Sequence, residues 1–130
     1  MNNKSLLRQK AIEVSKFAYS PYSKACVGSA MEMSDGSIYT GCNVENASYG
    51  GTICAERVAI FKAVSEGKKE IKNIYVYSDR GFPPCGMCRQ VISEFAAKDC
   101  VLTYGDINGK ETEVPFSDLL PFQFTDEFLK

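Results

Sequence analysis

Residues 71–77, with the sequence IKNIYVY, form a short run rich in Ile, Val and Tyr that predicts a β-strand. Before this run, residues 52–66 place apolar side chains at helical spacing and stop at Gly67, a common helix-capping residue. After it, a loop rich in Gly and Pro leads into a helical pattern over residues 86–97 and a strand pattern over residues 100–104. Helical and strand patterns that alternate in this way favour an α/β domain.

The flanking segments extend this pattern at both ends of the chain. A helix is predicted over residues 3–19, where Ser20-Pro21 stops it, and a hairpin over residues 25–42 turns at Ser34-Asp35-Gly36. A polar loop covers residues 43–51, and a last strand is expected over residues 111–114, before an aromatic tail. We therefore expect an α/β fold, a three-layer α/β/α sandwich with a mixed five-stranded sheet.

Composition narrows the class of protein. A chain of 130 residues with 45% hydrophobic content is long enough for one core, so residues 1–130 are interpreted as a single domain. No apolar run approaches the length of about 18 residues that a membrane span needs, and charges interrupt the first twenty residues. A formal net charge of −1 offers no general attraction for nucleic acid. We expect a cytoplasmic protein that binds neither membrane nor nucleic acid.

The cysteines carry the strongest chemical signal. The chain has six cysteines and no histidine, so a metal site here is built from thiolates and carboxylates. Cys85 and Cys88 are three apart at the start of a predicted helix, a spacing that lets both sulfurs bind one zinc ion, and Cys54 lies at the start of another. Unpaired N–H groups at a helix start favour the thiolate. Three protein ligands leave a tetrahedral position open, the pattern of a catalytic zinc site.

Glu56 follows Cys54 by two residues and can face the same space without binding the metal. Such a carboxylate can take a proton from activated water and return it to a leaving amine. Two alternatives stay open at this point. The Cys-x-x-Cys pair can be a redox pair, or half of a structural zinc site completed by Cys26, Cys42 or Cys100; these three lie in strand patterns typical of small buried side chains.

Together these residues resemble the cytidine deaminase family, in its small homotetrameric, three-cysteine zinc branch. The resemblance covers nearly the whole chain. It is carried by the segments 20–24, 27–28, 41–49, 54–57, 84–90 and 119–121, which read SPYSK, VG, GCNVENASY, CAER, PCGMCRQ and LLP.

The resemblance implies a reaction and roles for particular residues. One Zn²⁺ per subunit activates water for addition at carbon 4 of the pyrimidine, Glu56 transfers the protons, and ammonia leaves, so that cytidine and deoxycytidine become uridine and deoxyuridine in pyrimidine salvage. The backbone N–H of Ala55 is expected to bind the ring carbonyl. The carbonyl of Pro83 is expected to accept a hydrogen bond from the amino group, because proline lacks only the N–H.

The remaining roles follow from the same resemblance. Arg57 matches an arginine that hydrogen-bonds the ligand sulfurs and offsets the net charge of −1 that three thiolates leave on zinc. Asn43 and Glu45 match a pair that binds the ribose hydroxyls, and a carboxylate there favours nucleosides over 5′-phosphates. Phe124 matches an aromatic that enters a neighbouring subunit's site and stacks on the base, so a homotetramer with shared active sites is expected.

Two positions depart from the family pattern. Ala25 stands where the family usually has a phenylalanine against the nucleoside, and Gly51 stands where a larger apolar residue is expected. Both indicate a pocket of altered shape, and the lost stacking is worth on the order of 0.5 to 1.5 kcal/mol. An alternative activity is therefore deamination of a cytosine nucleoside analogue such as blasticidin S. A non-catalytic structural zinc module is the third hypothesis.

Overall fold

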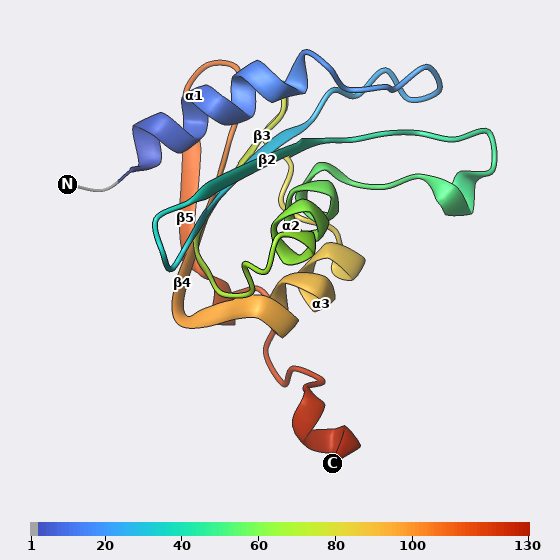
Figure 1. The fold of residues 1–130 in the computed structure, drawn as a ribbon. Helices are drawn as coiled ribbons and strands as arrows, with labels where there is room; N and C mark the ends of the chain where they lie inside the picture. Colours follow the sequence, from blue (N-terminus) through green and yellow to red (C-terminus); the bar gives the residue numbers. More distant parts are fainter. Residues whose placement is uncertain (1–2) are drawn as a thin grey trace.

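Five strands form one sheet in the part of the chain that this computed structural model describes, residues 3–130 (Figure 1). The strands are β1 (Gly28–Met33), β2 (Ile38–Cys42), β3 (Ile71–Tyr77), β4 (Ala96–Gly105) and β5 (Glu111–Pro115). Their order across the sheet is β2-β1-β3-β4-β5. Only β3 and β4 pair in parallel, and the other neighbours are antiparallel, so the sheet is mixed as predicted.

Helices cover both faces of this sheet. Helix α1 (Lys4–Ser15) lies on one face, while α2 (Ala55–Ser65) and α3 (Gly86–Phe95) lie on the other (Figure 1). The central strand β3 explains the layering, because successive side chains point to opposite faces. Ile74 and Val76 are buried in the core under α2 and α3, whereas Tyr75 packs in the core beneath α1. The three-layer prediction is confirmed. Within residues 3–130, no helix is long and apolar enough to cross a bilayer.

Some element boundaries differ from the predictions. Helix α1 ends at Ser15 rather than at residue 19, because Tyr19 pairs with the loop after β2: its N–H donates to Asn43 O at 3.0 Å. Helix α3 ends at Phe95, since the next residues already belong to β4. Cys26 was expected inside a strand as a buried side chain, but it precedes β1 and is exposed. In each case a pairing or ending set by the tertiary structure overrode a local pattern.

Helix α2 is seated on the sheet at a glycine. A Cβ atom added at Gly41 would lie 2.5 Å from both Ala55 O and Ala59 N, which are backbone atoms that cannot move aside. The Gly41→Ala variant is therefore expected to lose about 1 to 3 kcal/mol in free energy of unfolding, as overpacked sites do. Urea unfolding measures this, with Gly50→Ala as the control, because Gly50 has nothing within 4 Å. Equal stability of the two variants would contradict the close approach of α2.

Candidate active site

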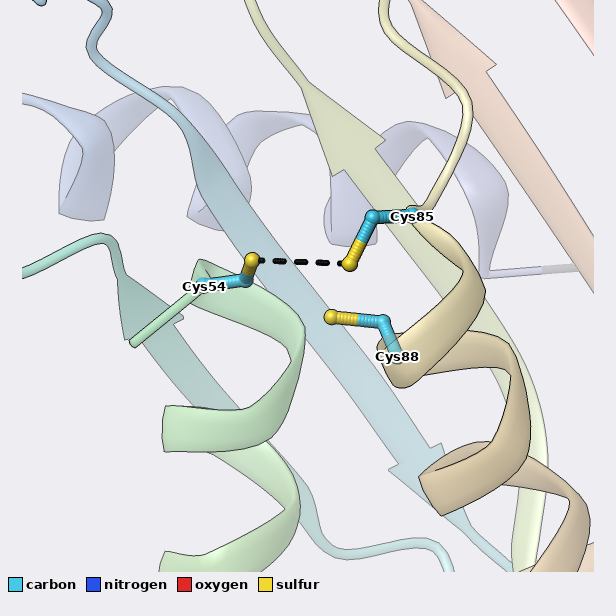
Figure 2. A group of neighbouring side chains, drawn as sticks. All are labelled: Cys54, Cys85 and Cys88. Carbon is cyan, nitrogen blue, oxygen red and sulfur yellow. Dashed lines mark hydrogen bonds between the residues drawn. The ribbon is translucent and has the colours of Figure 1, made fainter. Parts of the chain in front are cut away.

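Three cysteine sulfurs converge where two helices begin (Figure 2). Cys54 is the N-cap residue of α2, and Cys85 is the N-cap residue of α3. Neither sulfur makes a capping hydrogen bond. Cys88 lies in the first turn of α3 and is fully buried. The three sulfurs lie within 4.8 Å of one another, and Cys54 Sγ is 3.8 Å from Cys85 Sγ. Zinc with tetrahedral bonds of about 2.3 Å to sulfur needs sulfurs roughly 3.8 Å apart, so this donor set fits zinc.

The fourth position of such a tetrahedron has no protein ligand at hand. Among residues 3–130, the group of neighbouring His, Cys, Asp and Glu side chains that can hold a metal comprises these three cysteines alone. Cys26, Cys42 and Cys100 lie elsewhere, before β1, at the end of β2 and inside β4. A structural site with four cysteines therefore finds no fourth sulfur here. The arrangement leaves room for water or substrate, as in catalytic zinc sites.

Charge at the cluster is balanced by hydrogen bonds. A hydrogen bond from Cys88, together with one from Arg57, lowers the pKa of the Cys54 thiol to about 5 against the opposing effect of burial. The guanidinium of Arg57 lies with Nη2 3.5 Å from Cys54 Sγ and Nη1 3.0 Å from Met87 Sδ. These contacts place a permanent cation against the sulfurs. The side chain of Arg57 thus bridges the starts of α2 and α3.

Glu56 is buried beside the sulfurs, with only 4% of its surface exposed. Burial raises the pKa of its carboxyl to about 7, and the negative charge of Cys54 adds to the rise. A carboxyl that exchanges its proton near neutral pH suits proton transfer to and from a substrate. The side chain lines the same cavity as Cys54 and Cys85 without joining the sulfur group.

A cavity of about 240 Å³ opens in front of the cluster. It is bounded mainly by residues from the loop after β2, the start of α2 and the loop before α3. Backbone hydrogen bonds of 3.0 and 2.9 Å between Val44 and Ile53 hold the first two of these segments together. Residues predicted for the site that line it are Asn43, Glu45, Cys54, Ala55, Glu56, Pro83 and Cys85. The structure therefore gathers most of the predicted residues around one space of the size that small ligands occupy.

Asn43 and Glu45 also hold the loop before β1, which the sequence did not indicate. The Asn43 amide accepts from Val27 N at 2.9 Å and donates to Ala25 O at 2.7 Å. Glu45 accepts from the backbone N–H of Ser23 at 3.1 Å and from the Ser23 hydroxyl, and the hydroxyl contact lowers the pKa of the carboxyl. Both side chains thus face the cavity and at the same time fix one of its walls.

Phe124 lies outside the cavity of its own chain. It is 56% exposed, and its ring stacks on Phe128 with centroids 5.7 Å apart. The tail that carries both rings projects from the body of the fold (Figure 1). The structure of one chain therefore does not bring Phe124 to the site.

Five residues that line the cavity were not predicted from the sequence: Val27, Thr52, Ile53, Val76 and Phe82. Phe82 lines the cavity from the loop before Pro83, and Thr52 lines it just ahead of α2, with its hydroxyl oxygen accepting from Asn46 N at 3.1 Å. An aromatic residue placed directly before Pro-Pro-Cys was the available signal for Phe82. Nothing local marked Thr52, because its position depends on the pairing of Val44 with Ile53.

Comparison with known proteins adds independent support. Residues 1–104 match the family model described as the cytidine and deoxycytidylate deaminase zinc-binding region. The chain is 46% identical over 127 residues to a cytidine deaminase of Halalkalibacterium halodurans, covering 96% of each. The crystal structure of cytidine deaminase from Burkholderia pseudomallei superposes with a TM-score of 0.89 at 37% identity, covering 95% of this chain and 100% of that one. A blasticidin-S deaminase of Bacillus cereus is 36% identical over 109 residues, 76% of each chain.

Proposed function

This chain belongs to the cytidine and deoxycytidylate deaminase family, and on that basis we propose that it deaminates cytidine and deoxycytidine to uridine and deoxyuridine, releasing ammonia. It is a zinc-dependent hydrolase, and its reaction serves pyrimidine salvage. One observation carries the proposal: a buried carboxylate, Glu56, shares a cavity of about 240 Å³ with sulfurs spaced to hold one zinc ion. Acid–base and metal chemistry are thereby available at one place.

The residues divide the chemistry between them. Cys54, Cys85 and Cys88 would hold zinc, which when bound supplies Lewis-acid activation of water for attack on carbon 4 of the pyrimidine. Glu56 takes one proton from that water and passes it to the neighbouring ring nitrogen, then takes the remaining hydroxyl proton of the adduct at carbon 4 and gives it to the amine, so that ammonia leaves as the carbonyl forms. Because Glu56 is excluded from bulk water, the proton it holds is delivered to the substrate.

Backbone groups of the cavity orient the base. The N–H of Ala55 lies in the first turn of α2, where backbone N–H groups have no partner within the helix, and it donates to the ring carbonyl of the substrate. The carbonyl of Pro83 accepts from the amino group. Arg57 and the N-termini of α2 and α3 offset the net charge of −1 that three thiolates leave on zinc. Asn43 and Glu45 face the sugar hydroxyls, and the ionised Glu45 disfavours a 5′-phosphate.

The test is the conversion of cytidine to uridine, followed by the loss of absorbance of the cytosine chromophore. The purified chain is expected to turn over cytidine and deoxycytidine, and to turn over cytidine 5′-phosphate far more slowly. Removal of zinc by a chelator is expected to abolish turnover, and zinc added back is expected to restore it. A zinc-loaded protein with no turnover of either nucleoside would contradict the proposal.

A homotetramer with shared active sites fits the exposed aromatic side chains of the C-terminal tail. Phe122 is fully exposed and Phe128, whose ring stacks on Phe124, is 69% exposed, and apolar side chains exposed together mark protein interfaces. In an assembly, Phe124 stacks on the base bound by a neighbouring subunit, which accounts for its place outside its own cavity. None of the six cysteines forms a disulfide, which suits a cytoplasmic protein.

Shared sites predict complementation between two defective chains. Phe124→Ala is expected to raise KM for cytidine about 2- to 12-fold, the value of one stacking contact. When Phe124→Ala chains are unfolded and reassembled with Glu56→Gln chains, some sites combine Glu56 from one chain with Phe124 from the other and regain the parent KM. The control mixture combines Phe17→Ala chains with Glu56→Gln chains in the same way. If the rate of cytidine turnover by the mixture equals the sum of the rates of the two variants measured separately, Phe124 acts within its own chain or not at all.

A second candidate substrate is a cytosine nucleoside analogue such as blasticidin S. A second hollow of about 390 Å³ lies beside Ala25, bounded also by Lys24, Asp79 and Arg80, and Phe82 lines both this hollow and the main cavity. Gly51 leaves open space as well, since a Cβ there would meet nothing closer than 3.6 Å. Such room beside the cavity suits a nucleoside with a long polar substituent, and the Bacillus cereus blasticidin-S deaminase is a relative.

Comparing kcat/KM for cytidine and blasticidin S separates the two substrates. The Ala25→Phe variant sharpens the comparison, because the ring fills the second hollow and restores an aromatic beside the main cavity. If the analogue is the substrate, this change lowers its turnover and improves that of cytidine. Negligible turnover of blasticidin S by the parent protein would eliminate this candidate.

A further inference from the structure

Arg89 joins the loop that carries a metal ligand to the C-terminal segment. Its Nε donates to the carbonyl of Pro84 at 2.8 Å, and its Nη1 donates to the carbonyl of Leu119 at 3.0 Å. The guanidinium is planar and rigid, so its two bonds hold the two carbonyls at a set separation. Arg89 and Leu119, which are thirty positions apart in the chain, are thereby joined.

The Pro84 carbonyl belongs to the peptide bond that leads into Cys85. That bond is planar, so fixing the carbonyl also fixes the direction in which the Cys85 backbone leaves it. Pro83 and Pro84 have no N–H groups, so neither of these two residues can hold the turn through a backbone donor. The Cys85 sulfur is committed to the metal cluster and makes no capping hydrogen bond at the start of α3. An external donor is needed here, and Arg89 provides it.

Leu119 is a firm anchor for the other end of this link. It is packed against the main hydrophobic core, and its own N–H donates to Phe116 O at 2.8 Å. Phe116 is only 3% exposed. The next residue of α3, Gln90, donates to the carbonyl of Phe124 at 2.9 Å, so the segment after Leu119 is held along the same helix. Arg89 thus fixes the turn before Cys85 relative to the hydrophobic core. Gln90, in contrast, holds only the C-terminal tail.

We propose that Arg89 is a positioning residue for the metal site, which uses Leu119 as its anchor to hold Cys85, and with it the Pro83 carbonyl, in place for zinc and substrate. The part concerning substrate rests on the proposed function, whereas the part concerning zinc does not. Gln90, in this scheme, positions Phe124 and has no effect on the metal.

The rate of zinc release to a chromophoric chelator tests this role directly. Arg89→Met is expected to release zinc about 10- to 100-fold faster than the parent, the range for groups that orient metal ligands. The release rate of Arg89→Lys is expected to lie between those of the parent and of Arg89→Met, because a single ammonium does not span both carbonyls as the guanidinium does. Gln90→Met and the exposed Lys98→Met are the matched controls and should release zinc at the parent rate. Gln90→Met should instead raise KM for cytidine.

Release at the parent rate from folded Arg89→Met would overturn the proposal, as would equal acceleration in Lys98→Met, which would indicate general loosening. If Arg89→Met does not fold, Arg89→Lys decides: release at the parent rate overturns the proposal, and faster release from a protein with unchanged circular dichroism supports it. Zinc release requires no substrate. A parent protein that holds zinc but leaves cytidine unchanged would count against the proposed function and not against Arg89.

Discussion

Glu56→Gln is expected to lower kcat for cytidine by about 10²- to 10⁴-fold, the usual contribution of a group that transfers protons in the transition state. Glutamine has nearly the size of glutamate, so it fills the same buried position, but it neither accepts nor returns a proton. The zinc content should stay at one per chain, because Glu56 lies outside the sulfur group. Metal analysis and steady-state kinetics on the same sample measure both quantities.

Glu94→Gln is the matched control, since Glu94 is an exposed carboxylate on α3 and takes no part in the cavity. It should keep the parent kcat. Turnover by Glu56→Gln at the parent rate would remove Glu56 from its role. Loss of zinc from the same variant would show instead that the carboxylate helps to hold the metal, and the proton-transfer role would need another carrier.

Cys88→Ala is expected to lose zinc and, with it, all measurable deamination. Removing a ligand sulfur should weaken zinc binding by more than the roughly 10- to 100-fold that loss of a supporting group costs. Metal content after dialysis and the rate of cytidine conversion measure the effect.

Cys100→Ala provides the comparison that separates metal binding from packing. Cys88 and Cys100 are both buried, but Cys100 lies in β4, away from the sulfur group. Cys100→Ala should keep zinc and activity, with at most a modest loss of stability from the removed sulfur. If Cys88→Ala kept a full complement of zinc, Cys88 would be no ligand, and the interpretation of the cavity as a catalytic zinc site would fail.

The sequence alone determined the layers, the sheet and the family. The run over residues 71–77 predicted the central strand with its exact bounds, because a strand buried on both faces needs apolar side chains at nearly every position. Cys54 and Cys85 were both placed at helix starts from local patterns, and the structure puts each at the cap of its helix. Such features depend on neighbours within a few residues, so the order of the amino acids is enough to show them.

Tertiary structure alone decided how the site is held together. The hydrogen bonds of Asn43 to the loop before β1, the pairing of Val44 with Ile53, and the link from Arg89 to Leu119 all join residues distant in the chain. Local patterns carry no record of such contacts, because each arises only after the sheet and its helices have packed. The sequence therefore predicted which groups perform the chemistry, and the packed fold decided which groups hold them in position.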